Sequence, residues 1–315
     1  MMTKKLTGVF LDVATFGQDI NLEPLNALPI DWQMHSYSSS DEVLQRCADA
    51  QVIITNKVQL DAQTLSQLPE LKLICVAATG MNNVDLVAAK SHGITVKNVK
   101  NYAGNSVAQL VISLMLELLN NTSKYRERVA QGAWSQSKSF CLLDFPITEV
   151  TGRTLGLIGY GTLAKSVEKI ALAFDMKVLI AEHKNASVLR QGRTSFDDVI
   201  KHSDVISLHC PLTAETTDLI SKTELELMKD TAVIINTARG GIINEADLIQ
   251  ALQKNIIAGA ALDVVSVEPP PEEHIMLTQL DNLIITPHIA WASIEARQRL
   301  LNQVSDNIKQ HFLQP

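Results

Sequence analysis

Three polar residues in the second half of the chain have side chains suited to acid–base chemistry, and each follows an apolar run. They are Arg239 in N-T-A-R-G-G, Glu268 in V-V-S-V-E-P and His288 in T-P-H-I-A-W. An arginine can bind a 2-oxo carboxylate with two hydrogen bonds and polarise the neighbouring carbonyl. A histidine can donate a proton to that carbonyl oxygen while hydride reaches its carbon, and a nearby carboxylate keeps the imidazole protonated near neutral pH.

Taken one at a time, the three residues have ordinary structural explanations. An arginine after a strand is usually a surface residue, a glutamate before prolines is typical of an exposed loop, and a histidine after T-P more often caps or packs. Their placement favours chemistry, because each follows its own predicted strand, and open parallel sheets bind ligands at the carboxyl ends of their strands. The set therefore predicts a site that reduces a small 2-oxo acid with a nicotinamide cofactor.

A glycine turn near the middle of the chain predicts where that cofactor binds. The apolar run 154–158 leads into Gly159-x-Gly161-x-x-Ala164, and a helical pattern follows. This succession of strand, turn and helix is typical of a dinucleotide site, in which the pyrophosphate lies at the positive end of the helix. Glu182 ends the next apolar run, where a carboxylate can accept hydrogen bonds from the ribose hydroxyls. A glycine-rich turn of another α/β protein would leave this glutamate unexplained.

The elements that must position these residues form two α/β halves. Short β-branched or apolar runs predict the strands, and helical patterns separate most of them. The expected strands cover residues 8–13, 51–57, 71–77, 94–99, 154–158, 178–181, 205–208, 232–236, 258–262 and 283–285. We therefore expect open parallel sheets, and a final amphipathic helix over 292–312 that returns to the first half.

A long apolar helix is expected between the two halves. Ser106 is its predicted N-cap, and the helix runs through about Leu119. Because this helix is apolar on nearly every face, we expect it to be buried on all sides, in part against a second subunit. Residues 120–150 are expected to be irregular; they include Trp134 and are too apolar for a free linker, so we expect an arm across a dimer interface. The chain is therefore predicted to form a homodimer.

Composition limits the functions open to the chain. Its 315 residues exceed what one hydrophobic core serves and predict two domains. A net charge of −7 argues against a nucleic-acid partner or an anionic membrane surface. The four cysteines are scattered, which is typical of a reducing compartment and gives no metal signature, and no apolar segment is long enough to span a membrane. We expect a cytoplasmic protein that binds a small molecule and no metal.

These motifs resemble those of the D-isomer-specific 2-hydroxyacid dehydrogenase family, over nearly the whole chain. The gaps of 29 and 20 residues between Arg239, Glu268 and His288 are similar to those of the family's catalytic Arg, Glu and His. The resemblance implies a Rossmann dinucleotide-binding domain over 104–288. That domain would be inserted into a flavodoxin-like parallel α/β substrate-binding domain, which consists of 1–103 and 289–315.

Two sequence motifs resemble one branch of the family in particular. The stretches A-A-T-G-M-N-N-V-D and H-I-A-W-A-S, the second starting at His288, resemble the glycerate dehydrogenase (hydroxypyruvate reductase) branch. That branch implies that backbone N–H groups around Ala78, Thr79 and Gly80 bind the substrate carboxylate. Relatives with phosphorylated substrates usually carry an arginine in this loop, which this chain lacks. A phosphate without a cation would be poorly compensated, so we disfavour 3-phosphoglycerate as the substrate.

The resemblance also assigns residues to the cofactor. They come from the glycine turn, from later strand ends and from the catalytic loops: Gly159, Gly161, Thr162, Leu163, Glu182, His209, Pro211, Thr237, Ala238, Asp263 and His288. Asp263 is expected to face the nicotinamide carboxamide. Because the Glu182 carboxylate repels a 2′-phosphate, NAD is favoured over NADP. Lys184 partly offsets that preference, so NADP stays open.

The expected reaction is the NAD(P)H-dependent reduction of hydroxypyruvate, and of glyoxylate, to D-glycerate and glycolate. Two alternatives remain open. One is a dinucleotide-sensing binding protein similar to corepressors of this fold, which would tolerate loss of the arginine, glutamate and histidine. The other is a reductase of bulkier 2-oxo acids, because Met81 beside the substrate loop is compatible with either pocket size.

Overall fold

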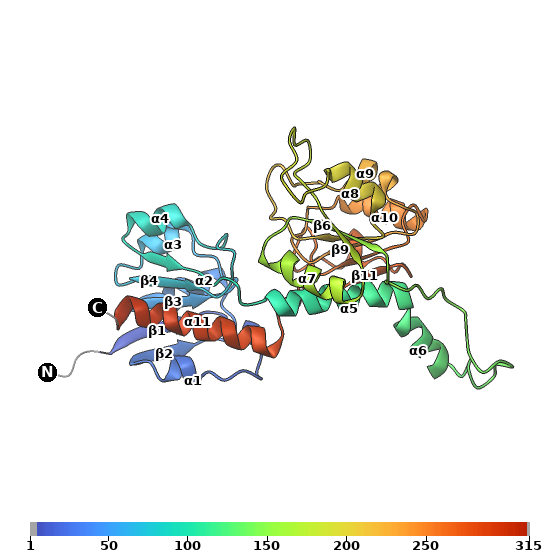
Figure 1. Cartoon of the computed structure of the whole chain (residues 1–315). Helices are drawn as coiled ribbons and strands as arrows, with labels where there is room; N and C mark the ends of the chain where they lie inside the picture. Colours follow the sequence, from blue (N-terminus) through green and yellow to red (C-terminus); the bar gives the residue numbers. More distant parts are fainter. Residues whose placement is uncertain (1–4, 314–315) are drawn as a thin grey trace. The chain divides into compact units, whose positions relative to one another are not determined.

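The computed structural model describes residues 5–313, which divide into two compact units. One unit comprises the chain up to Ala103 together with the segment from Ala292, and the other is Gly104–Trp291. The chain therefore leaves the first unit once and returns to it with its last helix. Each unit is built on its own parallel sheet with helices (Figure 1), so the predicted α/β class with two domains is confirmed.

The first unit has a five-stranded parallel sheet in the order β2-β1-β3-β4-β5, which is the flavodoxin-like order. Its strands are β1 (Leu6–Phe10), β2 (Ile30–Met34), β3 (Val52–Thr55), β4 (Leu73–Val76) and β5 (Thr95–Lys97). Every residue of β3 and β4 is buried, because central strands of a parallel sheet are covered on both faces.

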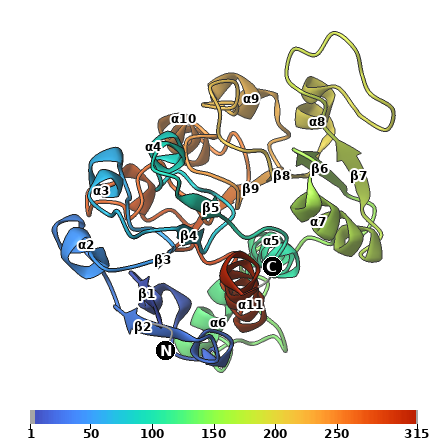
Figure 2. The same ribbon diagram turned by 90° about the vertical axis from the view of Figure 1, so that its left-hand side faces the viewer.

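Helices pack on both faces of this first sheet. They are α1 (Glu23–Asn26), α2 (Ser40–Cys47), α3 (Ala62–Ser66), α4 (Leu86–Ser91) and α11 (Ile294–Phe312), with a 3₁₀ turn η1 (Val13–Phe16). The helices α2, α3 and α4 share one buried cluster with the sheet, whereas α11 packs on β4 and α1 (Figure 2). The α11 residues Leu300, Leu301, Val304 and Ile308 are fully buried, so this last helix is part of the first unit's core.

The second unit has a six-stranded parallel sheet in the order β11-β10-β9-β8-β6-β7. Its strands are β6 (Thr154–Ile158), β7 (Lys177–Ile180), β8 (Val205–Leu208), β9 (Val233–Asn236), β10 (Gly259–Leu262) and β11 (Leu283–Ile285). The chain steps from β6 to β7 on one side and then to β8 on the other. Parallel sheets bind ligands where the strand order reverses in this way, outside the carboxyl ends of the strands.

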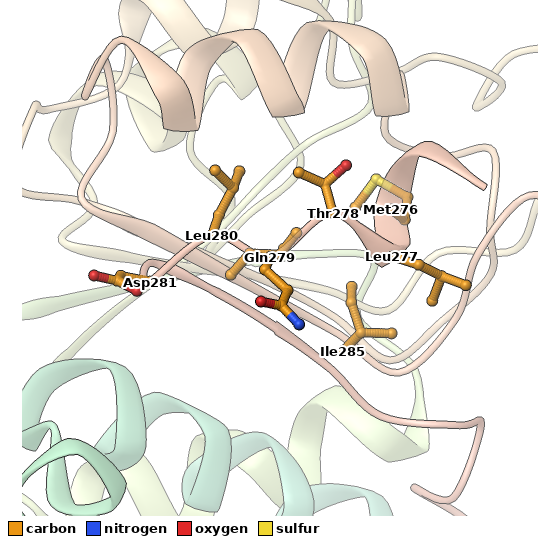
Figure 3. A pocket seen from close by; sticks show the side chains of 8 residues that line it. Met276, Leu277, Thr278, Gln279, Leu280, Asp281 and Ile285 are labelled. Atoms are coloured by element: carbon orange, nitrogen blue, oxygen red, sulfur yellow. The ribbon is translucent and has the colours of Figure 1, made fainter. Parts of the chain in front are cut away.

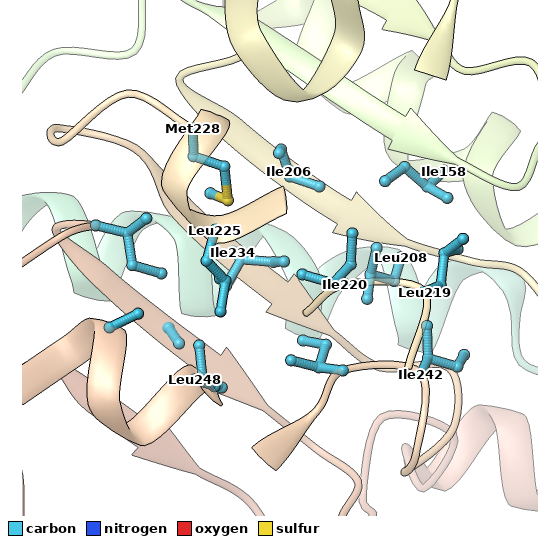
Figure 4. Close-up of a cluster of buried hydrophobic side chains, with 14 of the residues drawn as sticks. Ile158, Ile206, Leu208, Leu219, Ile220, Leu225, Met228, Ile234, Ile242 and Leu248 are labelled. Atoms are coloured by element: carbon cyan, nitrogen blue, oxygen red, sulfur yellow. The ribbon is translucent and has the colours of Figure 1, made fainter. Parts of the chain in front are cut away.

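The helices of the second unit are α5 (Gly104–Asn120), α6 (Thr122–Ala130), α7 (Thr162–Ala173), α8 (Phe196–His202), α9 (Lys222–Leu227) and α10 (Glu245–Gln253), with a 3₁₀ turn η2 (Ile275–Leu277). The helices α5 and α7 pack against each other on one face of the sheet, and α8, α9 and α10 lie on the other (Figure 1). Strand residues such as Ile206 and Ile234 meet Leu225, Met228 and Leu248 there in a buried apolar cluster (Figure 4).

One strand was missed, and two local expectations were wrong. The strand β2 was not predicted, because as an edge strand it alternates between apolar residues and the exposed Asp31 and Gln33, whereas the prediction relied on continuous apolar runs. Ser106 is not an N-cap, because α5 begins at Gly104; the Ser106 hydroxyl instead donates a hydrogen bond to the Ala290 carbonyl (2.7 Å). The start of the 120–150 segment is helical, not irregular: α6 buries no residue, so it lacks the apolar period that reveals a helix.

Within residues 5–313, no helix is long and apolar enough to cross a membrane. In the same part of the chain, no group of three or more His, Cys, Asp or Glu side chains is arranged to hold a metal ion.

Two cysteines are expected to resist alkylation in the native protein at pH 8. Cys47 and Cys75 are buried, and burial raises the pKa of each thiol to about 12. Only about one thiol in 10⁴ is then ionised at pH 8, and the thiolate is the reactive form. Iodoacetamide labelling followed by mass spectrometry should leave both unmodified in the native protein and modify all four cysteines in guanidinium chloride. Rapid native labelling of Cys47 or Cys75 would contradict this expectation.

Candidate functional site

The second sheet places the predicted polar residues at the carboxyl ends of its strands, which form one edge of the sheet. Arg239 follows β9, Asp263 and Glu268 follow β10, and His288 follows β11. These three strands are adjacent and parallel, so their carboxyl ends lie side by side. The loops that carry the candidate catalytic residues therefore leave the same edge of the sheet.

Glu268 and His288 form a hydrogen-bonded pair at this edge. His288 Nδ1 lies 2.6 Å from Glu268 Oε2, and the other carboxylate oxygen, Oε1, accepts a hydrogen bond from the Val265 N–H (3.1 Å). Because a carboxylate only accepts hydrogen bonds, Nδ1 carries a proton and Nε2 is left for another partner. The pair therefore leaves the Nε2 end of the imidazole available to a further hydrogen-bond partner.

Asp263 anchors the turn that carries His288. Its carboxylate is buried and accepts three hydrogen bonds, from the Thr286 hydroxyl (2.5 Å), the Ile289 N–H (2.9 Å) and the Ala290 N–H (2.7 Å). Its backbone carbonyl accepts a fourth from the His288 N–H (2.9 Å). These bonds hold His288 at a φ of 54°, a left-handed conformation that residues other than glycine seldom adopt.

The sequence did not reveal this anchoring role of Asp263. We expected the side chain to face the nicotinamide carboxamide, and that contact stays a prediction. The structure directs the carboxylate at the backbone of the His288 turn instead. The one available signal was an acidic residue directly after a strand in which every residue is buried, since a buried carboxylate needs several donors.

Arg239 is exposed, and its guanidinium makes only a local contact. Nη1 donates to the carbonyl of Ala238 (2.6 Å), while the Asn236 side chain bridges the turn by donating to the Arg239 carbonyl (2.8 Å) and accepting from the Ala238 N–H (3.0 Å). Among the described residues, no carboxylate lies within ion-pair distance of Arg239. Its charge is therefore available to an anionic ligand.

The loop that carries Glu268 is packed against the loop that carries Arg239. A side chain at Gly240 would place its Cβ 1.9 Å from the Val265 carbonyl oxygen, so only glycine permits this approach. The same loop is tied to α10, because Glu245 accepts hydrogen bonds from the Ser266 N–H (2.6 Å) and hydroxyl (2.8 Å). These contacts fix the backbone on either side of the candidate catalytic pair.

The glycine turn after β6 has the shape that a dinucleotide requires. Gly159 has a φ of 84°, and a Cβ on it would lie 2.5 Å from the Cys210 backbone nitrogen. Gly161 precedes α7, and no atom lies within 4 Å of where its Cβ would be. A pyrophosphate can use that open space at the helix N-terminus, where Thr162 is exposed and Leu163 partly buried. Ala164 is fully buried, as close packing of helix on strand demands.

Other predicted cofactor residues also lie at this edge. The Thr237 hydroxyl is buried and has no hydrogen-bond partner within residues 5–313, as expected of a group whose partner is a bound ligand. His209 Nε2 lies 2.9 Å from the Ser207 hydroxyl, and burial lowers the pKa of His209 to about 4, so this imidazole is neutral near pH 7. Pro211 is exposed and Ala238 half-buried in the loops after β8 and β9. These features fit a bound dinucleotide.

Glu182 lies at the end of β7, as expected, but its carboxylate is already occupied. Arg190 donates to it from Nε (2.7 Å), from Nη2 and from its backbone N–H (3.2 Å), and the His183 N–H adds a fourth hydrogen bond (2.9 Å). The Arg190 guanidinium holds the pKa of Glu182 well below its usual range. Arg190 was missed, because no sequence motif links a loop arginine to the acid eight residues before it.

The predicted substrate loop belongs to the first unit, directly after β4. Two backbone carbonyls of this loop already accept hydrogen bonds. The Ala78 carbonyl accepts from the Val99 N–H (3.1 Å), and the Thr79 carbonyl accepts from Asn98 Nδ2 (2.7 Å). Within the described chain, no protein group accepts a hydrogen bond from the N–H of Ala78, Thr79 or Gly80. Three adjacent N–H groups without a partner suit a carboxylate.

A separate pocket lies beside the edge strand β11 and has a volume of about 320 Å³ (Figure 3). Its lining comprises Met276, Leu277, Thr278, Gln279, Leu280, Asp281, Leu283 and Ile285. None of these residues belongs to the predicted site, so this pocket is distinct from the candidate active site.

The second unit, with a glycine turn at the strand-order reversal of a parallel sheet, defines a dinucleotide-binding protein of the α/β class. Residues 112–290 match the family model described as D-isomer specific 2-hydroxyacid dehydrogenase, NAD binding domain. The chain belongs to this family, and the resemblance found in the sequence is confirmed.

Similar proteins cover nearly the full chain. A glycerate dehydrogenase of Methylorubrum extorquens is 44% identical over 98% of this chain and 96% of its own length. A hydroxypyruvate reductase of Blautia hydrogenotrophica is 37% identical, over 93% of this chain and 92% of its own. Among solved structures, a D-lactate dehydrogenase of Aquifex aeolicus, complexed with NAD and lactic acid, has a TM-score of 0.79 and 30% identity, over 96% of this chain and 95% of its own.

Proposed function

We propose that this protein reduces hydroxypyruvate to D-glycerate, and glyoxylate to glycolate, with hydride from a bound nicotinamide dinucleotide. The observation that carries the proposal is the pair formed by His288 and Glu268 at the carboxyl edge of the dinucleotide-binding sheet. Similarity to proteins named glycerate dehydrogenase and hydroxypyruvate reductase supports this choice of substrates.

Each site residue has a defined task in the proposed reaction. His288 donates the Nε2 proton to the carbonyl oxygen at C2, and Glu268 stabilises the imidazolium before that step. Arg239 binds the substrate carboxylate and polarises the carbonyl. The N–H groups of residues 78–80 also bind the carboxylate. The bound cofactor supplies the hydride.

The cofactor role falls to the second unit. The open space at Gly161 and the N-terminus of α7 suit a pyrophosphate, and the unpaired Thr237 hydroxyl offers a further contact. We assign cofactor binding to residues 104–288, and substrate binding to residues 1–103 with 289–315. The contacts of Leu163, His209, Pro211, Ala238 and Asp263 with the cofactor remain part of this proposal.

Two other functions are less well supported. A dinucleotide-sensing corepressor would not need a histidine fixed at positive φ against a glutamate, and this chain builds that arrangement with a buried aspartate. A reductase of bulkier 2-oxo acids uses the same catalytic residues and differs only in the substrate pocket. Turnover of different substrates separates it from the proposed function.

The function is tested by following absorbance at 340 nm. Purified protein receives hydroxypyruvate, glyoxylate, pyruvate or a branched 2-oxo acid, each with NADH and with NADPH. Rapid oxidation with hydroxypyruvate, and much slower oxidation with the branched acid, is the expected result. Faster turnover of the branched acid would favour the bulkier-substrate reductase. No turnover with any acid, despite bound NADH, would favour the sensing protein.

We also propose that the chain forms a homodimer through the segment after α5. This segment exposes apolar side chains that its own unit leaves uncovered: Trp134, Phe140, Leu143 and Ile147. Phe140 is 91% exposed and Leu143 79% exposed, which is costly in water and typical of a surface that a second copy covers. The four free thiols favour a cytoplasmic location.

Light scattering should report a mass twice the 34.5 kDa of one chain at micromolar concentration. The double variant Phe140→Asp, Leu143→Asp is expected to shift the protein to the monomer, because each aspartate would be buried without a partner. Val87→Asp is the matched control: Val87 is 82% exposed on α4 of the first unit, and its variant should stay dimeric. A monomeric wild type would overturn the dimer.

A further inference from the structure

The loop after β7 brings a second arginine to the end of that strand. Arg193 Nη1 donates to the carbonyl of Ala181, the residue just before Glu182 (3.2 Å). The Arg193 guanidinium also lies over the ring of Tyr160, with 4.9 Å from its carbon to the ring centroid. Tyr160 stands between the two glycines of the turn after β6. Arg193 is therefore fixed between the glycine turn and the end of β7.

Glu182 cannot accept a further hydrogen bond without losing one. A carboxylate offers about four acceptor positions, and four donors already fill them: three from Arg190 and one from the His183 N–H. The side chain of Glu182 is 3% exposed, whereas that of Arg190 is 57% exposed. A ligand that reaches the end of β7 therefore meets the guanidinium of Arg190 rather than the carboxylate.

The charge at this strand end is positive. Arg190 neutralises Glu182, and Lys184 is paired with Glu224 (2.8 Å). For Arg193, no carboxylate lies within ion-pair distance among residues 5–313, so its charge is not compensated there. Arg190 uses Nε and Nη2 on Glu182, which leaves both N–H groups of Nη1 for an anion. Arg190 and Arg193 thus offer hydrogen-bond donors at this strand end, where the sequence alone predicted that the Glu182 carboxylate would repel a 2′-phosphate.

We propose that Arg190 and Arg193 bind the 2′-phosphate of an NADP-type cofactor, so that the protein uses NADPH as well as NADH. The inference rests on the proposed dehydrogenase function and deepens it. In dinucleotide-binding sheets the ribose of the adenosine half lies near the acid at the end of the second strand, and an arginine there accommodates a 2′-phosphate. The planar guanidinium matches phosphate oxygens with two parallel hydrogen bonds.

Calorimetric titration of the full chain with 2′,5′-ADP and with 5′-AMP tests the proposal, because the two probes differ only in the 2′-phosphate. The wild type should bind 2′,5′-ADP at least as tightly as 5′-AMP, and added salt should reduce this advantage. Arg190→Ala should weaken 2′,5′-ADP about 10–100-fold, the usual effect of losing a charged hydrogen bond, and leave 5′-AMP within about threefold. The NADPH-to-NADH ratio of kcat/KM should fall in parallel.

Lys169→Ala on α7 is the matched control, because it removes one exposed positive charge from the same unit outside the loop. It should change neither affinity. Arg190→Lys keeps the charge without the paired hydrogen bonds and should lie between wild type and Arg190→Ala. This variant, with the wild-type comparison, decides the question even if Arg190→Ala fails to fold.

The proposal is overturned if the wild type binds 2′,5′-ADP ten times more weakly than 5′-AMP. Glu182 would then displace Arg190 when the ribose binds, and the protein would be an NAD enzyme. Unchanged 2′,5′-ADP affinity in Arg190→Ala and Arg190→Lys would equally overturn it. Failure of NADH and both nucleotides to bind is a different result, because it removes the proposed function itself.

Discussion

The His288→Gln enzyme should lose about 10²–10⁴-fold in kcat with hydroxypyruvate, the range expected when a general acid is removed. Glutamine keeps a polar side chain but has no group that can transfer a proton as imidazolium does. NADH affinity, measured by quenching of protein fluorescence, should stay within about threefold of the wild type, because the glycine turn is untouched.

His202→Gln is the matched control for this variant. His202 is exposed at the end of α8 and has no part in the candidate site, so its variant should keep full activity. Glu268→Gln should lower kcat by a smaller factor, because the imidazole keeps a hydrogen-bond partner but loses the negative charge beside it. Wild-type turnover in His288→Gln would exclude His288 as the acid.

Asp263→Ala should cost about 3–5 kcal/mol of unfolding free energy and most of the activity. The substitution leaves the Ala290 N–H, which is buried, and the Ile289 N–H, which is partly buried, without an acceptor, at about 1–3 kcal/mol for each group. It also releases the turn that holds His288 at positive φ. Urea unfolding measures the stability, and kcat with hydroxypyruvate measures the effect on the acid.

Asp263→Asn separates the anchoring role from a contact with the cofactor. The amide keeps one acceptor oxygen but turns an NH₂ group toward a backbone N–H, so stability and kcat should both fall. An unchanged unfolding midpoint with a raised KM for NADH would instead identify Asp263 as a cofactor contact. Asp230→Asn, at an exposed position without an ion pair in the described chain, is the control and should behave as wild type.

The sequence predicted the α/β class and most strands, because buried parallel strands are continuous apolar runs. Residues 205–208 and 283–285 were predicted with the bounds that the structure has. The solvent-exposed helix α6 was not predicted, since it buries no side chain and leaves no period in the sequence. The edge strand β2 was missed for a different reason: its residues alternate between apolar and polar, whereas the prediction relied on continuous apolar runs.

In the candidate site too, some features could be predicted from the sequence and others could not. The glycine turn, Glu182 and the pair of Glu268 with His288 could be placed from spacing, because each follows its own strand. The hydrogen bonds of Asp263 to the His288 turn and of Arg190 to Glu182 could not, because they depend on how loops fold back in space. Partner choice among loop residues is a tertiary property that a strand pattern does not contain.

The place of α11 in the first unit imposes an order on folding during synthesis. Its buried leucines, Leu300 and Leu301, belong to the core of a unit whose sheet is made at the start of the chain. All of Gly104–Trp291 leaves the ribosome before them. Chains fold as they emerge, so the second unit can complete its core while the first still lacks a helix. The part of the protein that is made first is therefore the last to finish folding.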